Sequence, residues 1–137
     1  MIVAGLGLRS AATVASLRDA LDRAFDAAAA RPVRRVHLLA TAQDKLGKRC
    51  LEEFAAELGV SLQGVPRDLL ERMQTLTDNP VVRGLRGSAS VAEAAALGVA
   101  RLRGATQPRL LGPRAISADA LATCALAVFE PPGGLRS

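Results

Sequence analysis

The chain has 137 residues and a formal net charge of +5, with 50% of its residues hydrophobic and 23% charged. This length allows one domain with a substantial core, and the composition argues against a disordered chain. No apolar run approaches the roughly 20 residues that a membrane helix needs, and three Phe without Trp or Tyr offer few rings for stacking on bases. We therefore expect no membrane and no nucleic acid as partners. The apolar start lacks a signal-peptide pattern, so we expect a cytoplasmic protein.

The first half of the chain alternates apolar runs with helical periodicity. Apolar runs predict strands at residues 2–8, 36–41 and 60–65. Ser10 is expected to cap a helix that ends near residue 30, a second helix at 50–58 is expected to stop at Gly59, and Pro66 is expected to open a third. His37 is expected to be a packed residue of the second strand.

The second half begins with an irregular stretch at residues 75–89 and continues with a helix of small residues. Ser90 and Glu93 have the spacing of a capping box at the start of this helix. A short strand is expected at 109–111 and a loop at 113–118. The apolar segment 119–129 is ambiguous, because its Ala and Leu favour a helix while its length also suits a strand.

Strands that alternate with helices predict an α/β sandwich, in which ligands bind beyond the carboxyl ends of the strands. That edge is expected to collect several cations, including Arg9, Lys45 and Arg114. Helix N-termini at Ser10 and Ser90 are expected to add N–H donors. The sequence therefore predicts an anion-binding site at this edge.

Other chemistry at this edge is less well supported. Gly5 and Gly7 follow a strand as in dinucleotide-binding proteins, but Ser10 replaces the third glycine of that motif. Asp44 and Glu93 are the acids near the edge and weak candidates for an acid–base pair; the alternative is a loop acid paired with a lysine and a capping glutamate. The two cysteines and the single histidine show no metal-ligand spacing, so we expect no metal.

Several segments together resemble the CobE family and the C-terminal domain of CbiG, both of cobalamin biosynthesis. The most specific segment is Ser90-Val-Ala-Glu-Ala-Ala-Ala-Leu97. The others are Gly5-Leu-Gly7-Leu-Arg9-Ser10, Leu39-Ala-Thr41, Asp44-Lys45, Asn79-Pro80, Gly87, Leu110-Leu111, Pro113-Arg114 and the segment 120–128. Their order and approximate spacing cover nearly the whole chain.

This resemblance implies a three-layer α/β/α domain over residues 1–130, with a mostly parallel or mixed sheet of about five strands and a loose tail at 131–137. The segment 120–128 would be the closing strand. The resemblance also implies a role in building the corrin ring, through the binding or handling of a polycarboxylated precorrin. Alternatives are a lactone hydrolase of the CbiG type and a docking module for another pathway enzyme. No cofactor is implied.

The expected site residues follow from the edge and the resemblance together. Arg9, Lys45 and Arg114 would pair with carboxylates, while glycines would allow close approach and serine hydroxyls would donate hydrogen bonds. The full set is Gly5, Gly7, Arg9, Ser10, Thr41, Lys45, Ser88, Ser90, Arg114 and Ser117.

Overall fold

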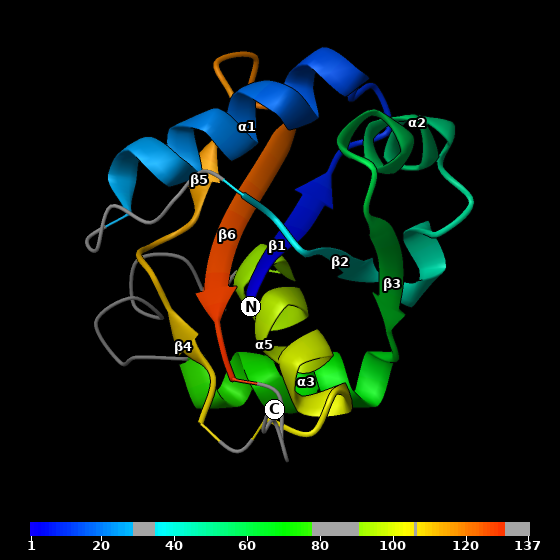
Figure 1. The fold of residues 1–137 in the computed structure, drawn as a ribbon. Coiled ribbons are helices and arrows are strands. Elements are labelled where there is room, and N and C mark those ends of the chain that lie inside the picture. The colour runs from blue at the N-terminus through cyan, green and yellow to red at the C-terminus, as the bar shows by residue number, and fades with distance from the viewer. Residues whose placement is uncertain (29–34, 78–90, 106, 131–137) are drawn as a thin grey trace.

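A mixed sheet of six strands forms the centre of the molecule (Figure 1). The computed structural model describes residues 1–28, 35–77, 91–105 and 107–130. The strands are β1 (Ile2–Leu8), β2 (Leu38–Ala42), β3 (Ser61–Val65), β4 (Arg109–Leu110), β5 (Ala115–Ile116) and β6 (Ala122–Val128). Their order is β3-β2-β1-β6-β4, with β5 also paired to β6. The pairs β1–β2 and β2–β3 are parallel, whereas β6 runs antiparallel to β1, β4 and β5.

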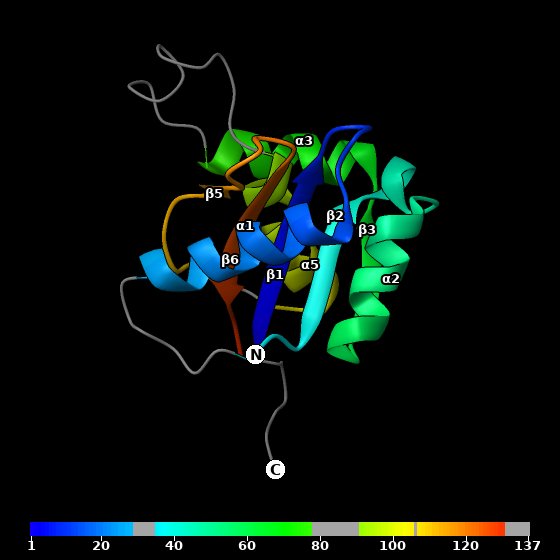
Figure 2. The same cartoon turned by 90° about the horizontal axis from the view of Figure 1, so that it is seen from above.

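Helices lie on both faces of this sheet. They are α1 (Val14–Ala27), α2 (Arg49–Leu58), α3 (Arg67–Thr77) and α5 (Val91–Leu102), with a short 3-10 helix, η1 (Gln43–Lys45). Helices α1 and α2 cover one face, and α5 lies against the other face with α3 packed on it (Figure 2). In the described part of the chain, no helix is both long and apolar enough to cross a membrane.

The alternation of side chains along the strands creates two cores. In β1, Ala4 and Leu6 point to the side of α1 and α2, where Leu17 and Phe54 are also fully buried. Val3 points to the opposite side and belongs to the core formed with α5 and α3. This period of two is what a strand covered on both faces requires.

Helix α5 packs unusually close to the sheet because its residues are small. Its alanines from 92 to 100 are all buried, and a helix with buried residues all round belongs inside a protein. A Cβ on Gly5 would lie 2.0 Å from the Ala92 carbonyl oxygen and 2.7 Å from the Ala96 backbone nitrogen. The close approach at Gly5 is therefore made by a neighbouring helix.

The structure confirms most expected elements, including a mixed sheet, and corrects three details. The segment 119–129 contains strand β6, and Gly59 ends α2. Helix α1 is capped by Thr13 and not by Ser10, because Ser16 completes a capping box with Thr13. The expected loop at 113–118 contains β5. His37 is exposed and precedes β2, with its Nδ1 accepting a hydrogen bond from the Ile2 N–H.

Four expectations lie outside the described residues. They are Ser88, the capping role of Ser90, residues 78–89 of the expected irregular stretch, and the loose tail at 131–137. Residues 75–77 of that stretch belong to helix α3.

Candidate functional site

A cleft of about 610 Å³ lies at the carboxyl ends of β1, β2 and β3. Parallel strands bring their ends, and the loops that follow, to one edge of the sheet, which is where α/β proteins bind ligands. The first residue of α5, Val91, also lines the cleft, so the positive end of that helix dipole lies beside it. The lining residues are Leu6, Gly7, Leu8, Thr41, Ala42, Gln43, Asp44, Lys45, Val65, Arg67, Leu70 and Val91.

The loop after β2 supplies the polar wall of this cleft. The chain turns directly from β2 into η1, so Asp44 and Lys45 are held beside the strand end. Thr41 is fully buried and its Oγ1 donates a hydrogen bond to the Leu6 carbonyl oxygen at 3.1 Å, which ties β2 to β1 at the cleft. The expected residues Thr41, Lys45 and Asp44 are thus brought together.

Arg67 supplies a second cation that the sequence reasoning missed. It is the first residue of α3, directly after Pro66 and the end of β3. Its Nε lies 3.7 Å from Glu71 Oε2, and its side chain is 91% exposed, so this contact holds it weakly. The sequence already contained the information needed to predict Arg67. Lys45 was chosen because it follows the end of the second strand, and Arg67 follows the end of the third strand in the same way.

The two glycines of β1, Gly5 and Gly7, differ in what lies beside them. Gly7 lines the cleft, and a Cβ there would lie 2.7 Å from Thr123 Oγ1. Gly5 does not line the cleft, because its open side is filled by α5.

Arg9, Ser10 and Arg114 are not among the described lining residues. The Arg9 N–H donates to the Leu121 carbonyl oxygen, which extends the β1–β6 ladder by one bond. The Arg114 N–H donates to Glu93 Oε2 at 3.3 Å. Glu93 therefore joins the first turn of α5 to the segment before β5.

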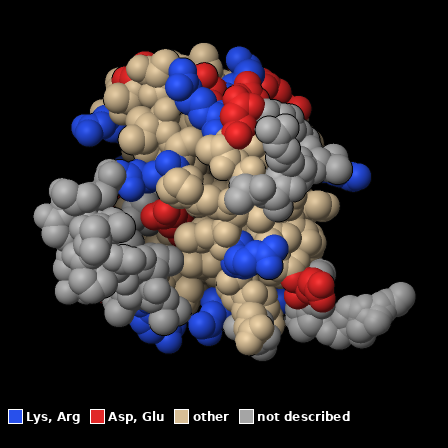
Figure 3. Space-filling model, turned by 90° about the vertical axis from the view of Figure 1, so that its left-hand side faces the viewer, with Lys and Arg blue, Asp and Glu red and all other residues tan. Residues whose placement is uncertain are grey.

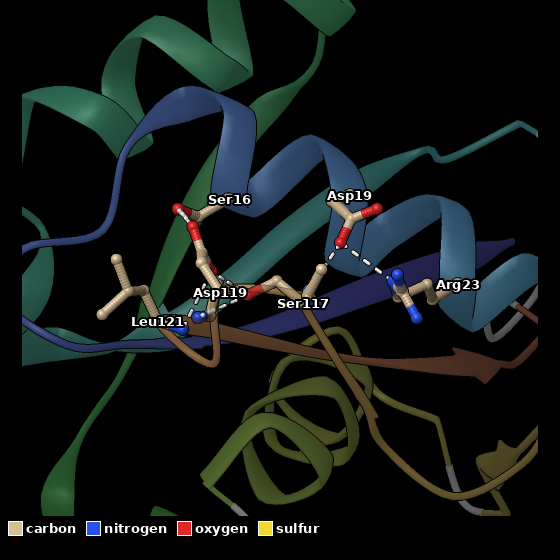
Figure 4. A network of polar contacts seen from close by, with 8 residues as sticks. Ser16, Asp19, Arg23, Ser117, Asp119 and Leu121 are labelled. Atoms are coloured by element: carbon tan, nitrogen blue, oxygen red, sulfur yellow. Dashed lines mark hydrogen bonds and ion pairs between the residues drawn. The ribbon is translucent and has the colours of Figure 1, made fainter.

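Ser117 belongs to a network that secures the turn before β6 (Figure 4). Its buried hydroxyl donates to Asp119 Oδ1 at 2.5 Å and accepts from the Ala122 N–H at 3.1 Å. Asp119 Oδ2 accepts from Ser16 Oγ of α1 at 2.7 Å, and Asp119 Oδ1 accepts from the Leu121 N–H at 3.0 Å. The hydrogen bonds from Ser117, Ser16 and Leu121 lower the pKa of the Asp119 carboxyl below its usual value.

A second acid, Asp19 of α1, reinforces the same turn. Asp19 Oδ2 accepts from the Ala118 N–H at 2.7 Å and from Arg23 Nε at 2.9 Å. Both hydrogen bonds lower the pKa of the Asp19 carboxyl, and the bond from the Ala118 N–H has the larger effect. Together the two acids bind the turn to α1.

Charge on the β4–β5 side of the molecule is dispersed. Figure 3 shows Lys and Arg side chains in separate groups on this side, with acidic side chains between some of them. Among the described residues, no cluster of three or more His, Cys, Asp or Glu could hold a metal ion. Cys124 is buried, and burial raises the pKa of its thiol.

Comparisons with known proteins agree with this architecture. The family model described as cobalamin synthesis G C-terminus matches residues 2–127. The crystal structure of CobE, a protein from the cobalamin biosynthetic pathway, is similar with a TM-score of 0.72 and 29% identity, over 95% of this chain and 92% of that chain. No curated protein matches the chain significantly.

Two further solved structures share the fold. The cobalamin biosynthesis protein chiG from Agrobacterium tumefaciens has a TM-score of 0.67 and 33% identity, over 93% of this chain and 98% of that chain. A cobalamin biosynthesis protein G homolog from Sulfolobus solfataricus has a TM-score of 0.63 and 20% identity. That match covers 94% of this chain but 37% of the Sulfolobus chain, so the same fold also occurs within a longer protein. The chain belongs to the cobalamin synthesis G C-terminus family and is a cobalamin biosynthesis protein of the CobE and CbiG C-terminal type.

Proposed function

We propose that the cleft binds a polycarboxylated precorrin intermediate of the corrin pathway. The observation that carries this proposal is the composition of the cleft: apolar side chains from several elements lie beside two cations, Lys45 and Arg67, from two different elements. A ligand that fits such a cleft has an apolar body with carboxylates at its rim. Precorrins have this form, since acetate and propionate groups surround an unsaturated ring.

The apolar part of the wall suits the ring of such a ligand. Leu6 and Leu8 of β1, Val65 of β3 and Leu70 of α3 line the cleft together with Val91. Ligand sites combine an apolar lining with a few polar groups that set the orientation, and a volume of about 610 Å³ lies within their usual range. The apolar wall would supply affinity, and the cations would set the orientation of the macrocycle.

The cations suit the carboxylates. Arg67 offers a planar fork that can bind a carboxylate through two hydrogen bonds, and Lys45 offers a single ammonium. Of the two acids considered as an acid–base pair, Asp44 lines the cleft and Glu93 is not among the described lining residues, so we propose binding and handling of the intermediate in preference to turnover. The names of the structural relatives, which place them in cobalamin biosynthesis, support the choice of ligand.

Titration with hydrogenobyrinic acid, followed by the absorbance of the pigment, tests this proposal. We expect the unmodified chain to bind the pigment saturably. In a Lys45→Ala/Arg67→Ala variant the affinity should fall about tenfold or more, because each charged contact contributes about 1 kcal/mol or more.

An Arg101→Ala/Arg103→Ala variant is the matched control. It also removes two positive charges, but at the opposite end of α5 from the cleft. Equal losses of affinity in the two variants would show that the pigment is held by general charge attraction and not at a defined site. Absence of binding by the unmodified chain at micromolar concentrations would refute the proposal.

A further inference from the structure

The sheet divides between β1 and β2 at the point where the cleft begins. The pairing of these two strands ends at Gly5 and Ala40. Beyond these residues β1 stays paired with β6 as far as Leu8, and β2 stays paired with β3 as far as Ala42. Residues of both diverging ends line the cleft. A fork in the sheet, with β1 on one side and β2 on the other, therefore opens the cleft.

The two sides of this fork carry different groups. The end of β1 presents apolar side chains and a glycine to the cleft. Both cations belong to the other side, because Lys45 follows β2 and Arg67 follows β3. The 3-10 helix η1, which contains Lys45, also packs on β3, since a Cβ added to Gly64 would lie 3.0 Å from Gln43 Cα. The width of the fork therefore sets the distance between the apolar wall on β1 and the cations.

The Thr41 hydroxyl makes the first bond across the fork. If the ladder continued by one residue, the carbonyl oxygen of Leu6 would accept a hydrogen bond from the Ala42 N–H, following the even spacing of bonds in a parallel pair. The fully buried Thr41 side chain donates to this oxygen instead, at 3.1 Å. A side chain thus satisfies a buried backbone acceptor just beyond the end of the ladder.

We infer that Thr41 is a positioning residue that holds this fork open. Its hydroxyl occupies the acceptor that the next ladder bond would use, so the Ala42 N–H stays out of the ladder and β2 stays apart from the end of β1. Thr41 thereby keeps Lys45 and Arg67 at the distance from β1 that the ligand requires. The effect on the ligand rests on the proposed binding of a precorrin, whereas the effect on the strands does not.

Thr41→Val tests this inference, because it removes the hydroxyl and keeps the shape of the side chain. The Leu6 carbonyl would lose its donor, and an unsatisfied buried carbonyl favours closure of the strands through a bond from the Ala42 N–H. We expect hydrogen exchange of the Ala42 amide, measured by NMR without ligand, to slow about tenfold or more. The affinity for hydrogenobyrinic acid should fall about tenfold, the equivalent of one hydrogen bond. Thr41→Ser keeps the hydroxyl and should retain the exchange rate and most of the affinity.

Thr123→Val is the matched control. The Thr123 hydroxyl donates to the carbonyl oxygen of Gly7, at 3.5 Å, from the opposite side of β1, where the pairing with β6 continues. Its loss should leave both measurements near those of the unmodified chain. Equal effects in Thr41→Val and in Thr41→Ser or Thr123→Val, or no change in Thr41→Val, would overturn the inference. If the unmodified chain binds no pigment, the proposed function is refuted, and the exchange rate of Ala42 in Thr41→Val still decides whether Thr41 holds the fork open.

Discussion

At the scale of single residues, Gly59 shows how one backbone conformation ends a helix. It follows α2 with φ +71°, and its N–H donates to the carbonyl oxygens of Ala55 and Ala56. A Cβ at this position would meet nothing within 4 Å, so the backbone conformation alone requires glycine.

We therefore expect Gly59→Ala to lower the free energy of unfolding by about 1 kcal/mol, the cost of the left-handed region for a residue with a Cβ. The measurement is the urea midpoint. Gly47→Ala is the control, because Gly47 also has open space but no positive φ. A loss in Gly47→Ala as large as in Gly59→Ala would contradict this explanation.

Asp119 is the second residue whose chemistry can be tested alone. Its pKa is lowered by hydrogen bonds from Ser117, Ser16 and Leu121. A carboxyl with a lowered pKa stabilises the folded chain above its unfolded pKa of about 3.9, and this contribution is lost as the pH falls through the folded value.

The Asp119→Asn variant should accordingly be less stable than the unmodified chain at pH 7, and the difference should shrink as the pH falls below about 4. Urea unfolding at a series of pH values measures this. Glu53→Gln, an exposed acid on α2, should show no such convergence. A difference between Asp119→Asn and the unmodified chain that stays constant from pH 7 to pH 3 would rule out the carboxylate as its source.

At the scale of secondary structure, the contact between α5 and β1 controls the architecture. Helix α5 packs on β1, β2 and β6, and its small residues let its backbone come near the sheet. Gly5 lies against α5, and the two atoms nearest to its missing Cβ, the Ala92 carbonyl oxygen and the Ala96 nitrogen, belong to the helix backbone and cannot rotate away. The small residues of α5 and Gly5 of β1 thus act together to allow the helix to pack close to the sheet.

Gly5→Ala should lower the free energy of unfolding by about 3 kcal/mol or more, because a methyl group would overlap the Ala92 carbonyl and force α5 away from the sheet. Chemical denaturation checks this. Gly112→Ala is a useful comparison, since a Cβ there would lie 3.4 Å from the Ala27 carbonyl oxygen, an ordinary contact. A loss of less than 1 kcal/mol, roughly, in Gly5→Ala would show that the helix yields easily.

At the scale of the whole molecule, the sheet edge gathers residues that lie far apart in the sequence. Gly7, Lys45, Arg67 and Val91 line one cleft because β1, β2 and β3 are parallel and α5 starts at the same end. The opposite direction of β6 places its first residues at this edge too, where the turn held by Asp119 connects to α1. The cleft is therefore a property of topology as much as of side chains.

The sequence by itself determined the three parallel strands, most helix bounds and the residues that follow these strands at one edge of the sheet. Hydrophobic periodicity and the stop at Gly59 are local, so they could be recognised without a fold, as could the placement of Lys45 and Asp44 after a strand. The strand identity of 120–128 depended on the family resemblance, since Ala and Leu suit both structures.

Only the tertiary structure decided which edge residues face the cleft. Arg9 and Arg114 lie near the edge in sequence, but neither is among the described residues that line the cleft. The Arg9 N–H bonds to the Leu121 carbonyl oxygen, and the Arg114 N–H bonds to the side chain of Glu93 in α5. The packing of α5 on β1 made Gly5 a helix contact. Partners more than 20 residues apart determine these roles, and a local pattern carries no information about such partners.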